Sequence, residues 1–251
     1  MVTFNMNIGS FFLTKKTKIL LLYGLIGISM IFGLIGKFVS GKLQKKFAQY
    51  SQMPTSSGMS GKEVAAEMLR YYNINDVEIT QGRGRLTDHY NPKTRVVSLS
   101  PDVYNGKTVS AAAVAAHEVG HAIQHAESYA MLEFRSAIVP IVQFSSRIQQ
   151  FIFGMGFMFV AMFNNSYFLL AAVAIFAVTA LFSVITLPVE FDASNRALAW
   201  LENTGITRGR EHDGAKDALK WAAMTYVVGA LAAIAQLLYI LMIFLNSRDR
   251  N

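Results

Sequence analysis

Residues 148–189 read IQQFIFGMGFMFVAMFNNSYFLLAAVAIFAVTALFSVITLPV, which is 42 consecutive positions without a charged side chain. A helix crosses the hydrocarbon core of a bilayer in about 20 residues, so this stretch is too long for one span and fits two. Its polar break, Asn164-Asn165-Ser166, is typical of the turn of a helical hairpin. The stretch therefore predicts a membrane hairpin with a short first arm, about 148–163, and a longer second arm, 167–189. The alternative is a first arm that begins near Ile138, with Arg147 snorkelling or facing protein.

Two further uncharged runs lie outside this hairpin, at 19–36 and 221–247. Four lysines and no small-residue cleavage pattern follow the first run, which favours a retained anchor over a signal peptide. Each run is long enough to cross a bilayer as a helix. We therefore expect a mainly α membrane protein with about four transmembrane helices.

The composition of the 251-residue chain agrees with this class, since 53% of the residues are apolar, 16% are charged and the mean hydropathy is +0.33. Cysteine is absent, which excludes disulfides, a thiol nucleophile and cysteine-ligated metal sites. The net charge is +7, but no basic stretch is interleaved with aromatic residues, so we expect no nucleic-acid partner. The expected partners are the lipid bilayer and a protein or peptide substrate, and the sequence leaves the oligomeric state unknown.

Polar segments between the spans carry signals for smaller elements. Ser60-Gly61-Lys62-Glu63 fits a capping box that opens a helix. Val77–Thr80 and Arg95–Leu99 predict short strands, and Thr108 caps an alanine-rich helix that runs to about His125. The second polar segment predicts a helix from Phe191, after Pro188, to about Glu202, and another from about Asp213 into the last span.

Residues 117–121 of the alanine-rich helix read His-Glu-Val-Gly-His. His117 and His121 are one helical turn apart, so both imidazoles can reach one ion. Glu118 lies about 100° round the helix axis, where it can take a proton from a water but is badly placed as a ligand. The pattern predicts a zinc site, because zinc accepts His and carboxylate ligands and makes water reactive at neutral pH.

A catalytic zinc needs a third protein ligand. Glu190 is the preferred candidate because it ends the third span on the same predicted side as the His117 helix. Its alternative role is that of an ordinary interfacial carboxylate at a helix start. Asp192 is the second choice, while His89 and His212 are isolated in the sequence.

Other polar residues near these motifs are candidates for supporting roles. His125 is expected to lie outside the ligand set or to face solvent, because three histidines in a row cannot close on one ion. His89 is expected to be a solvated loop residue, and its alternative role is to stabilise an oxyanion, which Tyr90 offers as well. Asn195 and Arg196 are weaker candidates for contacts around the metal or the transition state.

Three segments carry a family resemblance: Ser-Pro-Asp-Val-Tyr (100–104), Ala-Ala-His-Glu-Val-Gly-His-Ala-Ile-Gln-His (115–125) and Leu-Pro-Val-Glu-Phe-Asp-Ala-Ser (187–194). On these motifs the chain resembles the YugP-like family of neutral zinc metallopeptidases, from about Ser56 through the last span. The resemblance implies zinc, peptidase activity and a multi-pass location in the inner or plasma membrane of a prokaryotic cell. It implies no particular substrate.

More distantly, the chain is similar to the HtpX heat-shock proteases and the CAAX prenyl endopeptidases. Those families combine the HExxH motif with a later membrane hairpin and a glutamate ligand, which here corresponds to Glu190. Ser194 stands where their motif has a second acidic residue that orients a ligand histidine. The resemblance therefore leaves that orienting role open to Asp192 or Asn195.

These observations together predict a zincin-like helical catalytic domain with a small β element, and a membrane-bound zinc metalloprotease of the gluzincin type. The expected segments are an N-terminal region and first span (1–37), the catalytic domain (38–136), a membrane hairpin (137–189), a third-ligand helix and connecting segment (190–220), and the last span and tail (221–251). Either Arg95–Leu99 or Leu86–Tyr90 would provide an edge strand for substrate. The alternative function is a non-proteolytic scaffold or adaptor with a structural zinc.

Four spans would place segments 38–136 and 190–220 on the same side of the membrane. Positive charges near the span ends favour that side by ten to five, and they predict that it is cytoplasmic. The ten are Lys37, Lys42, Lys45, Lys46, Arg135, Arg196, Arg208, Arg210, Lys216 and Lys220, and the five are Lys15, Lys16, Lys18, Arg248 and Arg250.

Overall fold

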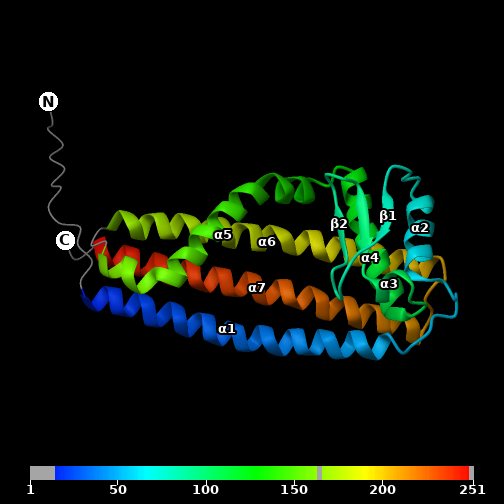
Figure 1. Ribbon diagram of the computed structural model, residues 1–251, viewed down its shortest axis with the longest axis horizontal. Coiled ribbons are helices and arrows are strands. Elements are labelled where there is room, and N and C mark those ends of the chain that lie inside the picture. The colour runs from blue at the N-terminus through cyan, green and yellow to red at the C-terminus, as the bar shows by residue number, and fades with distance from the viewer. Residues whose placement is uncertain (1–14, 163–165, 249–251) are drawn as a thin grey trace. The chain divides into compact units, whose positions relative to one another are not determined.

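A computed structural model describes residues 15–162 and 166–248, with side chains placed for 19–151 and 169–246. This part of the chain is mainly helical with one small sheet, as predicted (Figure 1). The elements are α1 (Lys15–Tyr50), α2 (Gly61–Tyr71), β1 (Glu78–Gln81), β2 (His89–Asn91), β3 (Val96–Leu99), α3 (Pro101–Tyr104), α4 (Val109–Ala126), α5 (Ala130–Met162), α6 (Ser166–Asn203) and α7 (Arg210–Arg248).

Three helices among the described residues are long and apolar enough to cross a membrane: Ile19–Tyr50, Leu169–Asn203 and Arg210–Asn246. Large apolar side chains on them are exposed, including Leu34 at 68% and Leu238 at 58%. A bilayer would cover such surfaces, which are unusual on a protein surrounded by water. The predicted span at about 148–163 falls mostly where side chains are not described, and Asn164 and Asn165 lie outside the described residues. The count of four spans therefore stays a prediction.

The chain forms two compact units, and α1, α5, α6 and α7 contribute to both. The described part of the first unit comprises residues 15–34, 138–162, 166–183 and 229–248. Its core includes apolar side chains of three helices, namely Leu21, Leu169, Phe176, Ile240 and Ile243. A hydrogen bond of 3.1 Å from Gln236 Nε2 to Ser29 Oγ also joins α7 to α1 within this unit.

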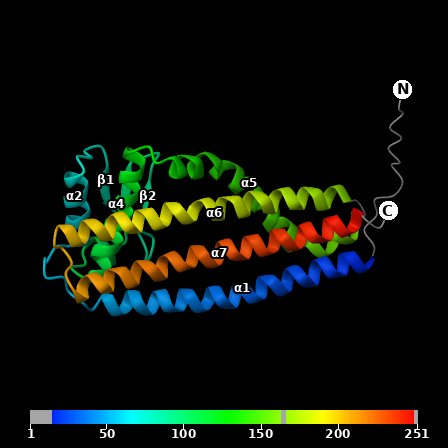
Figure 2. The ribbon, with the colours of Figure 1, turned by 180° about the vertical axis from the view of Figure 1, so that it is seen from behind.

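The second unit comprises residues 35–137 and 184–228 and contains the sheet and the short helices. Helix α4 packs against α2, α3, β2 and β3, and Figure 1 and Figure 2 both show α4 next to β2. The core of the second unit contains side chains of α2, β3, α3 and α4, including Val64, Met68, Val97, Leu99, Val103, Val119 and Ile123. The HExxH helix is therefore the central helix of this unit, which explains its alanine-rich sequence.

Local capping signals determine where α2 and α4 begin. Ser60 and Glu63 form the predicted capping box, in which Ser60 N donates to Glu63 Oε2 at 2.7 Å and Glu63 N donates to Ser60 Oγ at 3.3 Å. Thr108 Oγ1 accepts from Ala111 N at 3.4 Å at the start of α4. Each bond satisfies a backbone N–H that the helix itself leaves unpaired.

The sheet has the strand order β1-β3-β2, with β1 parallel and β2 antiparallel to β3. Because β3 is paired on both sides, the prediction that Arg95–Leu99 offers an open edge is wrong. The prediction of a loop at His89 is also wrong, since His89–Asn91 forms β2. This three-residue strand lacks an alternating apolar pattern, and its pairing with β3 is a tertiary contact that the local sequence does not encode.

Helix α6 runs without interruption from Ser166 to Asn203, so the prediction that a helix begins at Phe191 is wrong. Pro188 lacks one backbone N–H, but packing on both sides of the proline maintains the helix. Its buried face continues through Glu190, Ala193, Ser194, Ala197 and Leu201, at the spacing of successive helical turns. Glu190 therefore lies in the middle of a helix, on the face that is turned into the second unit.

Candidate metal centre

The two histidines of the motif project from one face of α4. His117 and His121 are one turn apart, their ring centroids are 4.8 Å apart, and the ring planes are inclined by 81°. Around them the helix is built from Ala115, Ala116 and Ala122, all at most 1% exposed. Such small side chains allow neighbouring helices to approach the imidazoles closely.

Glu190 of α6 meets both histidines at this face. Its Oε2 lies 3.3 Å from His117 Nε2 and 3.6 Å from His121 Nε2. One ligand atom from each of the three residues lies within 4.8 Å of the others. The structure thus brings together the three residues that the sequence analysis proposed as metal ligands.

The donor set fits a divalent metal ion. Glu190 is only 3% exposed, and its Oε2 is buried without a hydrogen-bond partner. Arg135 pairs with Oε1 of this carboxylate, and a cation between the two imidazoles would pair with Oε2, which is otherwise costly to bury. Two imidazole nitrogens and one carboxylate oxygen are ligands that zinc takes in catalytic sites with an open fourth position.

Gly120 allows α4 to approach α6 at this point. A Cβ atom at Gly120 would lie 2.6 Å from the carbonyl oxygen of Ala193, which is closer than real Cβ contacts allow. Since a backbone atom cannot move aside as a flexible side chain can, glycine is required here. The glycine of the HExxH motif thus permits the helix contact that places His121 beside Glu190.

Each of the three proposed ligands is hydrogen-bonded to a further side chain. Ser194 Oγ is hydrogen-bonded to His117 Nδ1 at 3.1 Å, Gln124 Oε1 lies 3.0 Å from His121 Nδ1, and Arg135 Nη1 donates to Glu190 Oε1 at 3.1 Å. Ser194 therefore contacts His117 itself. Gln124 and Arg135 were not predicted from the sequence. Only the i+3 spacing of Gln124 from His121 was a usable signal, since the Arg135 contact joins separate helices.

Glu118 lies beside the cluster without belonging to it. The residue is only 8% exposed, and burial raises the pKa of its carboxyl group, while the neighbouring His117 and His121 act in the opposite direction. A raised pKa makes the carboxylate a stronger base toward the proton of a water molecule. Its position and environment suit a general base better than a ligand.

Asp192 and Arg196 lie behind the cluster and make contact with each other. Arg196 Nε donates to Asp192 Oδ2 at 2.6 Å, and Arg196 Nη1 donates to Glu127 Oε2 at 2.6 Å. Asp192 is linked to His121 only through Gln124, whose Nε2 donates to Asp192 Oδ2 at 2.8 Å. Asn195 is exposed on α6.

The remaining candidates lie outside the three-residue cluster. His89 is exposed on β2, with its Nδ1 2.8 Å from Thr87 O. The Tyr90 hydroxyl is hydrogen-bonded to His125 Nδ1 at 2.8 Å, which links the edge strand to the HExxH helix. His212 lies near Glu202, with Nε2 and Oε2 3.6 Å apart.

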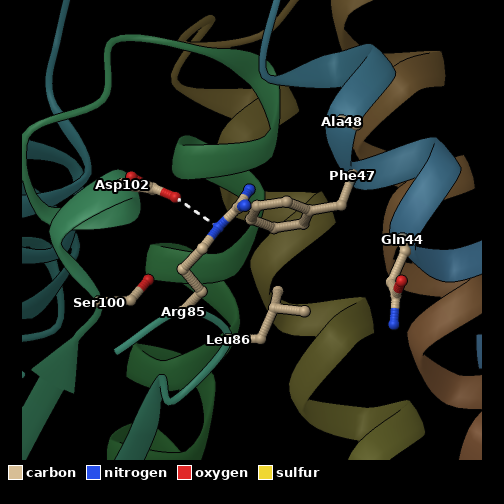
Figure 3. A pocket seen from close by; sticks show the side chains of 7 residues that line it. All are labelled: Gln44, Phe47, Ala48, Arg85, Leu86, Ser100 and Asp102. Atoms are coloured by element: carbon tan, nitrogen blue, oxygen red, sulfur yellow. Dashed lines mark hydrogen bonds and ion pairs between the residues drawn. The ribbon is translucent and has the colours of Figure 1, made fainter. Parts of the chain in front are cut away.

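A small pocket in the second unit lies between α1 and the loop before β2, as Figure 3 shows. It includes Phe47 and Leu86, and the ion pair of Arg85 Nε with Asp102 Oδ2 at 3.1 Å lies beside them. Its volume is about 40 Å³, far below that of a typical ligand pocket. None of the proposed metal ligands lines it.

Comparisons with known proteins agree with the donor set. A family model described as "Putative neutral zinc metallopeptidase" matches residues 25–245. The chain is similar to a protein of Bacillus subtilis (strain 168) named "Putative membrane protease YugP", with 43% identity over 210 residues that cover 84% of this chain and 92% of that relative. No solved structure matches the chain.

Proposed function

The chain belongs to the family described as "Putative neutral zinc metallopeptidase", and on that premise we propose that it is a membrane-bound zinc endopeptidase of the gluzincin type. Its substrates are proposed to be membrane proteins or proteins at the membrane surface, because α1, α6 and α7 are apolar enough to hold the site at a bilayer. The observation that carries the proposal is the buried, unpaired Oε2 of Glu190 between two imidazole nitrogens.

In this proposal His117, His121 and Glu190 hold the zinc ion. Bound zinc would supply Lewis-acid chemistry, which lowers the pKa of a water and polarises the scissile carbonyl group. Glu118 takes the proton of the attacking water and passes it to the amine leaving group, so that a single carboxylate serves as base and then as acid. Arg135 and Ser194 keep Glu190 and His117 in place during these steps.

The sheet suggests how an extended substrate is aligned. Helix α4 contacts β2, and β2 has no neighbour on its outer edge among the described strands. A substrate strand that pairs with His89–Asn91 would satisfy the unpaired backbone groups at this edge and run close to the HExxH helix. Of the two edges considered from the sequence, the one that includes His89 and Tyr90 is thus the proposed binding edge.

Removal and return of the metal test the proposed activity. We expect the detergent-solubilised protein to cleave fluorescently labelled β-casein, to lose cleavage after treatment with 1,10-phenanthroline and dialysis, and to regain it with stoichiometric zinc. A parallel circular-dichroism spectrum must show that the helices persist without metal. Zinc binding with no cleavage of casein or of membrane-protein fractions would instead support a scaffold with a structural zinc.

We further propose that residues 38–136 and 190–220 face the cytoplasm, at the inner or plasma membrane of a prokaryotic cell. The support is the excess of lysine and arginine on that side. In this orientation the end at Arg250 lies outside the cytoplasm. Alkaline phosphatase fused after Arg250 should therefore be active, and green fluorescent protein fused at the same position should not fluoresce. The same reporters fused after Gly58 should behave in the opposite way. Fluorescence after Arg250 would contradict the orientation.

A further inference from the structure

Gln124 makes three hydrogen bonds in the interior of the second unit. It follows His121 by three residues on α4 and is 0% exposed. Its Oε1 lies 3.0 Å from His121 Nδ1, and its Nε2 lies 2.8 Å from both Val189 O and Asp192 Oδ2. The last two atoms belong to residues that flank Glu190 on α6, so one side chain contacts both helices that carry the proposed ligands.

These contacts determine the direction of each hydrogen bond. A backbone carbonyl and a carboxylate only accept, so the Gln124 amide nitrogen must face Val189 and Asp192. The amide oxygen must then face His121, whose Nδ1 has to donate the proton. His121 Nε2, on the side of Glu190, is thereby left with a lone pair for a metal. Ser194 has no such effect at His117, because a hydroxyl group donates as well as accepts.

The network continues from Asp192 back to α4. Arg196 binds Asp192 Oδ2 through Nε and Glu127 Oε2 through Nη1, both at 2.6 Å. Glu127 is the C-terminal cap residue of α4. Besides the Ser194–His117 hydrogen bond, helices α4 and α6 are therefore connected by Gln124 and by Arg196, and both of these connections include Asp192.

We propose that Gln124 is a positioning residue that sets the tautomer of His121 and holds α4 in register with α6, and that zinc affinity depends on it. The inference rests on the proposed metal site. Outer partners of ligand histidines typically contribute about 10–100-fold to metal affinity. Gln124 combines this role with a connection between the two ligand-bearing helices.

The first test is Gln124→Met, which removes all three hydrogen bonds at nearly constant volume. Zinc affinity of the detergent-solubilised full chain is measured by competition with a chelating indicator, and we expect it to fall by about 10–100-fold. Gln81→Met, at an exposed position of β1, is the matched control and should bind as the wild type does. Asp192→Asn keeps an oxygen that accepts from Gln124, and its zinc affinity should stay within about threefold of that of the wild type. Wild-type affinity in Gln124→Met would overturn the inference.

A second pair of variants tests the hydrogen-bond direction, and it also serves if Gln124→Met fails to fold. Gln124→Glu keeps an acceptor for His121 but turns a carboxylate oxygen toward Asp192 and the Val189 carbonyl, so zinc affinity should fall. The Gln124→Glu/Asp192→Asn double variant removes the added negative charge, and it should bind zinc about tenfold more tightly than Gln124→Glu. A residue that only fills space would show no such rescue, and its absence would contradict the proposal.

Different results would contradict the proposed function and the positioning role of Gln124. If the wild-type protein binds no zinc, the proposed function fails and Gln124 has no ligand to position. If the wild type binds zinc and the Gln124 variants bind it equally well, only the positioning role is lost. Metal-free thermal unfolding of each variant is recorded in parallel, because a purely structural role would lower that transition temperature and leave zinc affinity unchanged.

Discussion

Replacing Glu118 with glutamine is expected to abolish cleavage and to leave zinc in place. Glu118 is buried beside His117 and His121, its pKa is raised by burial, and it does not belong to the group of atoms that converge with Glu190. Glutamine has nearly the same shape but cannot accept the proton of an attacking water. A positioned general base contributes about 10²–10⁴-fold to a rate, so kcat/KM on labelled casein should fall by about 10³-fold or more.

The matched control is Glu133→Gln, which makes the same chemical change at an exposed residue of the first turn of α5. Its turnover and zinc content should equal those of the wild type. Loss of zinc in Glu118→Gln would show that Glu118 acts as a ligand. Turnover within a few-fold of the wild type would remove it from catalysis and favour a scaffold with a structural zinc.

Replacing Glu190 with alanine is expected to remove the metal together with the activity. The variant loses one of the three groups proposed to bind the metal. It also loses the carboxylate that pairs with Arg135, so the positive charge of Arg135 is left without that partner. Two imidazoles alone hold zinc weakly, and the remaining Arg135 charge repels a second cation. Since outer partners already contribute about 10–100-fold, zinc affinity should fall by at least about 100-fold.

The parts of the fold that follow from short-range patterns could be predicted from the sequence. The Ser60–Glu63 capping box and the Thr108 cap act within one helical turn, and the apolar runs in α1, α6 and α7 are each continuous in the sequence. The HExxH spacing is equally local, because both histidines belong to one helix. Its structural context, a buried alanine-rich helix, could also be predicted from composition.

The parts that depend on packing between distant segments could not be predicted in the same way. Strand β2 exists because it pairs with β3, and α6 continues past Pro188 because its buried face packs in the second unit. The contacts of Arg135 with Glu190 and of Gln124 with Val189 join residues 55 and 65 positions apart. No local pattern encodes these two pairs, and the i+3 spacing of Gln124 from His121 indicates only its contact within α4.

Glu190 is an intermediate case. Its sequence neighbourhood suggested a ligand on chemical grounds, because a catalytic zinc needs a third one, and the family resemblance strengthened the choice. Its geometry depends on Gly120, whose missing side chain lets α4 approach the backbone at Ala193. That requirement could not be derived from the HExxH spacing, in which the position of the glycine is unrestricted.

The zinc content of purified protein tests the central claim, that His117, His121 and Glu190 hold one ion between two helices. Three proteins are equilibrated with limiting zinc and analysed for metal by mass spectrometry: the wild type, Glu190→Ala and the control Glu202→Ala. The control changes a glutamate on α6 whose side chain is 68% exposed. We predict close to one zinc per chain in the wild type and the control, and almost none in Glu190→Ala. Full occupancy in Glu190→Ala, or a wild type without zinc, would contradict the account.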